Sequence, residues 1–240
     1  ITASVVEVKS FEELATLGTK NVQGRIVFFN RPMDPTQLQT FAAYGGAVNQ
    51  RGGGAAEAAK YGAAGVIVRS MGINPESYPH TGGMSYRTGV PMIPAMAVST
   101  IHADLLSRLL KDDKGLSFYM EMHCQTLEDA PSFNVVGEIK GTEFKNEIIA
   151  IGGHLDSWDL GQGAHDDGAG CVQSIEVLRI FKAMGYKPKR TIRAVMFMNE
   201  ENGLRGGQKY ADLAKLNKEV HLAAIESDRG GFTPRGFTIS

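Results

Sequence analysis

One glycine-rich segment of the sequence concentrates side chains that can bind a metal ion. Residues 152–170, GGHLDSWDLGQGAHDDGAG, contain two His, four Asp and six Gly but no Lys or Arg. So many carboxylates in one loop would repel one another or raise each other's pKa unless a cation lay between them. A divalent ion would supply that cation, and mixed His and carboxylate ligands suit zinc or a neighbouring transition metal. We therefore predict that this loop wraps metal.

Similar side chains follow other predicted strands in this half of the chain. Three apolar segments each end in ionisable residues: His154 and Asp156 after 147–152, Glu200 and Glu201 after 191–198, and Asp228 after 220–226. Functional groups of open α/β sheets gather beyond the carboxyl ends of the strands, so these residues should meet Asp166 and Asp167 at one edge. Of two adjacent acids, one can bind the metal while the other accepts a proton from a metal-activated water.

The elements that position these residues form the second of two predicted domains. A Pro-containing segment, LEDAPSFN at 127–134, marks the boundary, so we place the first domain at 1–128 and the second at 129–240. In the second domain strands alternate with helices, which indicates an α/β fold with a partly parallel sheet. Its expected strands are 132–141, 147–154, 191–199 and 220–227, and its expected helices are 168–184 and 205–215.

The first domain has the pattern of short strands and helices. Apolar runs predict strands at 4–8, 24–30, 63–70 and 116–126, and helical patterns predict helices after Ser10, over 50–61 and after Ser99. Ser10 and Glu13 have the spacing of a capping box, in which the Ser caps the helix and the Glu side chain reaches back to the cap. Residues 1–128 are therefore expected to fold as one unit.

Composition argues against several classes of protein. With 25 Lys plus Arg against 26 Asp plus Glu in 240 residues, the chain lacks the basic surface of a nucleic-acid-binding or polybasic membrane-associated protein. No apolar run approaches the roughly 18–20 residues of a membrane span. Cys124 and Cys171 leave open whether the chain holds a disulfide or two thiols. The motifs of helical zinc proteases, serine hydrolases and dinucleotide-binding proteins are also missing.

Taken together, the segments GGHLDSWDLGQGAHDDGAG, FMNEENG and IESD resemble the co-catalytic zinc exopeptidases, a family of zinc aminopeptidases and glutamate carboxypeptidase-like enzymes. The spacings agree, because Asp166 lies 12 residues after His154, Glu201 35 residues after Asp166, and Asp228 27 residues after Glu201. The resemblance implies that the first domain is a protease-associated domain. It implies that the second is part of a mixed-sheet, phosphorylase/hydrolase-like catalytic domain.

The family pattern assigns four residues to two zinc ions. Asp166 would bridge both ions, with His154 and Asp228 completing one site and Glu201 belonging to the other. The second site takes a further His well downstream in the family, and none of the 12 residues after Asp228 is His. The family segment that precedes the protease-associated domain is missing too. We therefore expect a chain truncated at both ends, with an incomplete second zinc site.

The resemblance also implies roles for residues around the metal. Glu200 would be the general base, and Asp156 would orient the imidazole of His154 and so fix its tautomer. The peptide bond between Asp166 and Asp167 is expected to be cis. Four other histidines, expected to have no special role, are His80, His102, His123 and His221, and nothing assigns a role to His165.

The function implied is hydrolysis of a terminal peptide bond of small peptides or dipeptides through a metal-activated water. Aminopeptidase, carboxypeptidase and dipeptidase activity all stay open. An alternative is a catalytically incomplete fragment that acts as a folded metal-binding or protein-binding module, and another is a different metal-dependent amide hydrolase on the same scaffold. The resemblance implies a secreted, periplasmic or cell-envelope location, although the sequence shows no signal peptide, and it is compatible with a homodimer.

Overall fold

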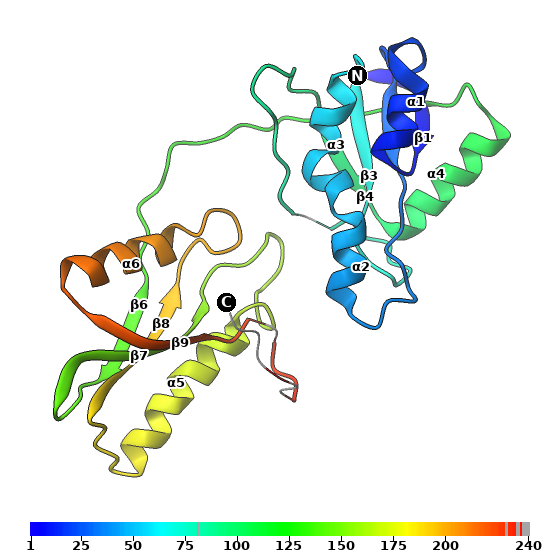
Figure 1. Cartoon of the computed structure of the whole chain (residues 1–240). Helices are drawn as coiled ribbons and strands as arrows, with labels where there is room; N and C mark the ends of the chain where they lie inside the picture. Colours follow the sequence, from blue (N-terminus) through cyan, green and yellow to red (C-terminus); the bar gives the residue numbers. More distant parts are fainter. Residues whose placement is uncertain (81, 229, 234–235, 237–240) are drawn as a thin grey trace. The chain divides into compact units, whose positions relative to one another are not determined.

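A computed structural model describes residues 1–80, 82–228, 230–233 and 236 of the chain. It has two compact units, Ile1–Thr126 and Leu127–Ser240, each with its own sheet (Figure 1). The division between them falls next to the Pro-containing segment. Within the described residues, no helix has the length and apolar character that crossing a bilayer requires.

The first unit is built on a five-stranded sheet in the order β4-β3-β2-β1-β5. Its elements in chain order are β1 (Thr2–Val8), α1 (Phe11–Val22), β2 (Ile26–Phe29), α2 (Thr40–Ala47), α3 (Asn49–Ala59), β3 (Gly65–Arg69), β4 (Ala95–Val98), α4 (Thr100–Asp112) and β5 (Ser117–Tyr119). Strands β1 to β4 run parallel and β5 runs antiparallel to β1, so the sheet is mixed.

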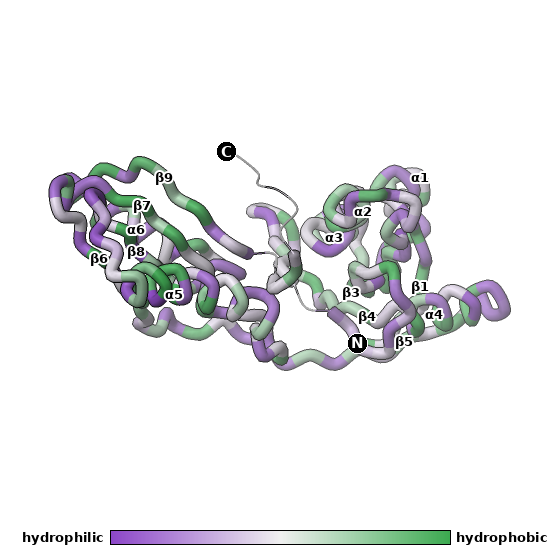
Figure 2. Tube along the Cα trace, turned by 90° about the horizontal axis from the view of Figure 1, so that it is seen from below, coloured by the Kyte–Doolittle hydropathy of each residue, from purple (hydrophilic) through white to green (hydrophobic). Residues whose placement is uncertain are grey.

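Alternate residues of β2 enter two hydrophobic clusters on opposite faces of this sheet. Val27 and Phe29 pack with residues of α1, α2 and α3, whereas Ile26 and Phe28 pack with residues of α4. Figure 2 shows hydrophilic and hydrophobic residues alternating along α4, as expected for a helix with one buried face. The first unit is therefore a sheet covered by helices on both faces.

In the first unit one helix was not predicted, and two local predictions differ from the structure. The helix expected over 50–61 is α3, and a second helix, α2, precedes it. The strand expected over 116–126 is only β5, because alternation of apolar and polar residues makes a strand only where a neighbouring strand pairs with it. Ser10 caps α1 by accepting the N–H of Glu13 at 3.1 Å, but the Glu13 carboxylate accepts the N–H of Lys9, at 2.6 Å, and not that of the cap.

The second unit has a four-stranded sheet in the order β6-β8-β7-β9. Its elements are β6 (Val135–Ile139), β7 (Phe144–His154), α5 (Gly168–Ala183), β8 (Arg190–Phe197), α6 (Arg205–Leu216) and β9 (Val220–Glu226). Strands β8, β7 and β9 are parallel, and β6 is antiparallel to β8. The predicted α/β fold with a partly parallel sheet is therefore confirmed.

Helices α5 and α6 pack against the two faces of this sheet. Cys171 of α5 is buried against Ala194 and Met196 of β8. On the other face, the ring of Tyr210 in α6 meets Phe197 of β8 edge-on, with 5.7 Å between the ring centroids. Because β8, β7 and β9 are parallel, their carboxyl ends lie together at one edge of the sheet, and the predicted site residues lie beyond that edge.

Candidate metal centre

The carboxyl ends of three neighbouring strands bring together residues from distant parts of the sequence. His154 is the last residue of β7, Glu200 and Glu201 follow β8, and Asp228 follows β9. Asp166 lies in the loop that joins β7 to α5. Because β7 is the strand between β8 and β9, His154 stands in the middle of this group.

The imidazole of His154 is the centre of a cluster of carboxylates. Its Nε2 lies 3.0 Å from Oδ1 of Asp228, 3.1 Å from Oδ1 of Asp166 and 3.8 Å from Oε2 of Glu200. The His154 side chain is 1% exposed, whereas those of Asp166 and Asp228 are 59% and 48% exposed. One ligand atom from each of these three residues lies within 4.8 Å of the others, a spacing that could hold a metal ion.

This donor set fits a divalent cation. One imidazole nitrogen and two carboxylate oxygens are the ligand types that zinc accepts. Among the residues that the structure describes, no ion pair joins Asp166, Asp228, Glu200 or Glu201 to a Lys or Arg. The negative charge is therefore met from within the cluster by His154 alone.

The tautomer of His154 is set by the chain two residues further on. Its Nδ1 lies 2.8 Å from the backbone carbonyl oxygen of Asp156. A carbonyl can only accept a hydrogen bond, so Nδ1 carries the proton and Nε2 of the neutral ring is left to bind metal. The contact with Nδ1 is made by the backbone of Asp156, since its carboxylate is 4.0 Å from Nδ1.

The Asp156 carboxylate instead holds a different loop. Its two oxygens accept the backbone N–H groups of Glu200, at 2.9 Å, and Glu201, at 3.1 Å. The side chain is 19% exposed, so these bonds are partly shielded from water. Asp156 therefore links the end of β7 to the residues that follow β8, a contact that the sequence did not predict.

Asp167 has a comparable role between β7 and α5. Its carboxylate accepts the backbone N–H of His154 at 3.0 Å and, as the N-cap of α5, that of Gly170 at 2.9 Å. Glycine is required here, because a Cβ on Gly153 would lie 2.4 Å from Asp167 Oδ2 and one on Gly170 would lie 1.8 Å from the carbonyl oxygen of Ser227. The peptide bond between Asp166 and Asp167 is cis, as predicted.

Burial and the crowded charges shift the pKa values of the cluster. Burial lowers the pKa of His154, but the Asp156 carbonyl and the carboxylates of Asp228 and Glu200 outweigh it and raise the pKa to about 9. Burial raises the pKa of Glu200, with His154 opposing it and Asp228 adding to it. Burial also raises the pKa of Glu201, and the nearby Asp166 carboxylate adds to this. The directions of these shifts follow from burial and from the crowding of several carboxylates around one imidazole.

The remaining predicted residues have distinct surroundings. Glu201 is held through its backbone, and its carboxylate lies outside the three-residue cluster and interacts with the Trp158 side chain. The ring of His165 packs edge-on against Phe232, with 4.9 Å between centroids. The four histidines expected to be ordinary each have a polar partner: His80 with Glu76, His102 with Ser99, His123 with Glu121, and His221 with Tyr210.

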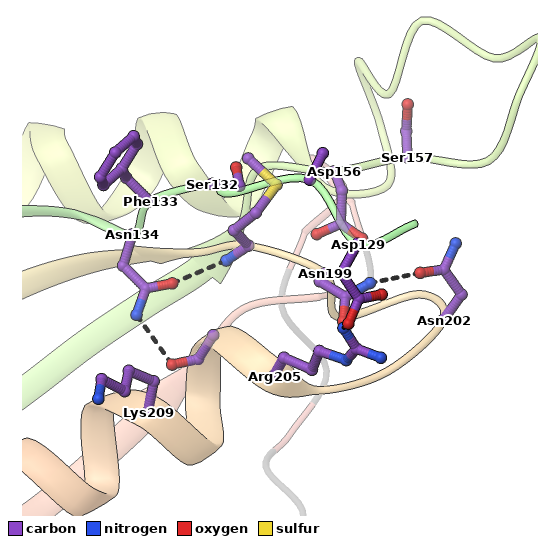
Figure 3. A pocket seen from close by; sticks show the side chains of 13 residues that line it. Asp129, Ser132, Phe133, Asn134, Asp156, Ser157, Asn199, Asn202, Arg205 and Lys209 are labelled. Atoms are coloured by element: carbon purple, nitrogen blue, oxygen red, sulfur yellow. Dashed lines mark hydrogen bonds and ion pairs between the residues drawn. The ribbon is translucent and has the colours of Figure 1, made fainter. Parts of the chain in front are cut away.

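A pocket of about 500 Å³ adjoins the loop that carries Glu200 and Glu201, and Asp156 lines it (Figure 3). Its walls also include Asn134, at the start of the sheet, and Arg205 and Lys209 of α6. Arg205 forms an ion pair with Asp129 at 2.6 Å. The sequence did not predict Asn134 at this edge, because only the orientation of β6 brings it there.

Comparison with known proteins gives concordant results. Peptidase family M28 matches residues 134–239. The whole chain is 39% identical to Carboxypeptidase Q from Bos taurus and to that from Homo sapiens, and it covers 49% of each. A probable zinc metalloprotease from Pyrenophora teres f. teres is 40% identical over 99 residues, covering 38% of this chain and 21% of that protein.

Solved structures show the same likeness. The structure of a peptidase M28 precursor from Shewanella amazonensis SB2B superposes with a TM-score of 0.86 at 37% identity, over 96% of this chain and 52% of that chain. A zinc aminopeptidase from Bacillus subtilis has a TM-score of 0.53 at 19% identity, over 95% of this chain and 49% of that one, which shows likeness of fold alone. The chain thus spans about half the length of the relatives that it matches over its whole length or nearly so.

Proposed function

Because this chain belongs to peptidase family M28 through residues 134–239, we propose that it forms part of a zinc-dependent exopeptidase. The substrate would be a small peptide or dipeptide, cleaved at a terminal bond. The observation that carries the proposal is the convergence of two carboxylate oxygens, at 3.0 and 3.1 Å, on Nε2 of a buried histidine. This arrangement stands at the sheet edge where α/β enzymes place their catalytic groups.

Three side chains would hold the first zinc ion: His154 through Nε2, and Asp166 and Asp228 through their carboxylates. Asp166 would also reach a second ion, with Glu201 as a further ligand. Zinc bound here supplies Lewis acidity, which makes a water more acidic and polarises the carbonyl of the scissile bond. The exposure of Asp166 and Asp228 leaves their free oxygens accessible from solvent, as a site that admits substrate requires.

Glu200 would act as the general base. Its Oε2 lies 3.8 Å from His154 Nε2, next to the proposed ligands, and burial raises the pKa of its carboxyl. A raised pKa brings a carboxylate closer to the working pH, at which it can accept a proton from water and return it to the leaving amine. The Asp156 carboxylate would hold Glu200 in place by accepting the backbone N–H of Glu200.

Several wider features of the proposal rest on the family resemblance. The first unit, Ile1–Thr126, would be a protease-associated domain, and the protein would act in a secreted, periplasmic or cell-envelope setting. A homodimer fits the same picture. The competing function is a metal-binding or protein-binding module without catalysis, and a metal-dependent hydrolase of another amide bond is a further alternative on this scaffold.

The test is to measure zinc content and peptide hydrolysis on the same purified protein. Dipeptides with both termini free, with a blocked amino group and with an amidated carboxyl group separate dipeptidase, carboxypeptidase and aminopeptidase activity. Glu200→Gln should lower hydrolysis about 10²- to 10⁴-fold, the usual contribution of a general base, and leave the zinc content unchanged. The matched control is Glu143→Gln. Glu143 lies in the turn between β6 and β7, where it pairs with Lys189 and not with a residue of the cluster.

Each outcome decides between the functions. Hydrolysis that survives in Glu200→Gln would show that Glu200 is not the base. Bound zinc without hydrolysis of any of the peptides would favour the non-catalytic module. A protein that binds no zinc would contradict the ligand set itself.

A further inference from the structure

The loop that carries Glu200 and Glu201 is closed at its base by backbone hydrogen bonds. It runs from Met198, just after β8, to Gly206, in the first turn of α6. The N–H of Gly206 donates to the carbonyl of Met198 at 3.0 Å, and that of Leu204 donates to the carbonyl of Asn199 at 2.6 Å. The two ends of the loop therefore lie side by side, with the two glutamates between them.

The side chain of Asn134 bridges both ends of this loop. Its Oδ1 accepts the N–H of Met198 at 3.0 Å, and its Nδ2 donates to the carbonyl oxygen of Gly206 at 2.8 Å (Figure 3). Both functional atoms of the amide are thus used, one on each end. A primary amide offers its donor and its acceptor on two separate atoms, and the only other side chain with this group, Gln, is one carbon longer.

Strand direction explains why Asn134 reaches this edge. Strand β6 is antiparallel to β8, with Val135 opposite Met196. The residue before β6 therefore lies where β8, β7 and β9 end, and not at the opposite edge of the sheet. Among the site residues described above, only Asn134 reaches this edge from the amino end of a strand.

Gly206 is fitted to the same contact. A Cβ at this position would lie 2.3 Å from the carbonyl oxygen of Met198 and 2.4 Å from Oδ1 of Asn134. Backbone and amide oxygens of this kind cannot both move away without breaking the bridge. Gly206 thus allows the two loop ends to approach each other closely and the Asn134 amide to join them.

We propose that Asn134 is a positioning residue that sets where Glu200 and Glu201 stand relative to His154. Asn134 fixes the two ends of the loop, and Asp156 holds its middle by accepting the N–H groups of both glutamates. Without the Asn134 amide, the backbone hydrogen bonds of Gly206 and Leu204 alone would join the loop ends, and the Asp156 carboxylate would have to hold a more mobile segment. The kinetic part of this inference rests on the proposed function, whereas the structural part does not.

The experiment is amide hydrogen exchange on Asn134→Ala and Gly206→Ala, each compared with the unchanged protein. We expect the amides of Met198, Glu200 and Glu201 to exchange at least about fivefold faster in both variants, since one net hydrogen bond corresponds to a factor of that order. The amides of the two glutamates are the informative ones, because their partner is Asp156 and not the altered residue. Faster exchange at Met198 alone would overturn the proposal.

The matched control is Thr142→Val, which lies just beyond the carboxyl end of β6. Thr142 Oγ1 donates to the carbonyl of Pro188 at 3.1 Å, so this variant also removes a side-chain bond between two segments of the sheet. It should leave exchange of the glutamate amides unchanged. A general loss of stability would instead accelerate exchange in all three variants alike, and that result would also overturn the proposal.

A kinetic measurement adds a readout that a purely structural role would not change. Asn134→Ala should lower kcat about 10- to 100-fold, the usual effect of losing a group that orients a site, with KM and the first equivalent of zinc little affected. In the Glu200→Gln background it should have no further effect on kcat. An unchanged kcat despite faster exchange would show that the bridge does not position the base. Failure of the unchanged protein to hydrolyse any peptide would refute the proposed function and leave the exchange result to decide the positioning role.

Discussion

Zinc binding to the metal-free protein should release about one proton from His154 at pH 7. The Asp156 carbonyl and the carboxylates of Asp228 and Glu200 outweigh the effect of burial and raise the pKa of this imidazole to about 9. With that pKa the ring is roughly 99% protonated at pH 7, whereas an imidazole with the ordinary value of about 6.5 is roughly one-quarter protonated. Zinc binds the neutral ring, so the proton must leave when the metal enters.

The same shift gives the metal-free second unit a defined dependence of stability on pH. The pKa of His154 is higher in the folded than in the unfolded chain, so its stabilisation is complete below about pH 6.5 and is lost as the pH rises through about 9. A difference of about 2.5 pKa units corresponds to about 3 kcal/mol of unfolding free energy. The His154 side chain is 1% exposed, but those of Asp166 and Asp228 are 59% and 48% exposed, so solvent screens part of the interaction and about 3 kcal/mol is an upper bound.

Calorimetric titration with zinc, in buffers that differ in ionisation enthalpy, measures the proton release directly. The number of protons released should fall from about one at pH 7 towards zero at pH 10, with a midpoint near 9, and NMR titration of the His154 ring in the metal-free protein should give the same midpoint. His123→Gln is the matched control, since His123 is exposed and pairs with Glu121 on the surface of the first unit. Release of about a quarter of a proton at pH 7, with a midpoint near 6.5, would refute the account of the cluster.

Two further predictions concern stability of the second unit, measured by urea unfolding of the metal-free protein. Asp167→Ala should lower the unfolding free energy by about 2–4 kcal/mol, because the buried carboxylate accepts two backbone N–H groups and caps α5. The control is Ser10→Ala, which removes one exposed cap bond in the first unit. A loss in Asp167→Ala no greater than in this control would contradict the prediction. Arg193→Met should cost about 3 kcal/mol, because it leaves Glu138 and Glu219 without the guanidinium that pairs with both. Adding Glu219→Leu to that variant should recover part of the loss, and a further loss of similar size would show that the pair is not coupled.

The sequence was sufficient to predict that His154, Asp166 and Asp228 lie close together. Apolar strands that end in ionisable residues identify themselves by composition, and the parallel arrangement of an α/β sheet then places those ends together. His154, Asp166 and Asp228 are brought together in this way, although 74 residues separate the first from the last. The expectation for these residues depended on strand direction and order alone, which is why it needed no side-chain geometry.

The parts that the sequence could not predict depend on contacts between the backbone and single side chains. An antiparallel and a parallel β6 have the same apolar pattern, so nothing indicated that Asn134 would lie beside Met198 and Gly206. The sequence also could not tell which oxygen of Asp156 would contact His154, because the carbonyl and carboxylate oxygens belong to the same residue; the carbonyl makes that contact and the carboxylate accepts the N–H of Glu200. A distance between atoms decides such questions, and residue spacing does not supply it.

The structure explains why a loop with four aspartates and no basic residue can fold. Asp156 and Asp167 each accept two backbone N–H groups, so hydrogen bonds from the peptide backbone solvate these carboxylates without any counter-charge. Asp159 lies on the exposed part of the loop, where water can solvate its charge. Asp166 remains, with its carboxylate directed at His154 and next to Asp228. The negative charge that no backbone group compensates therefore lies on one aspartate of the loop, Asp166, and one beyond it, Asp228, while Asp156 and Asp167 hold the glutamate loop and His154 around these two carboxylates.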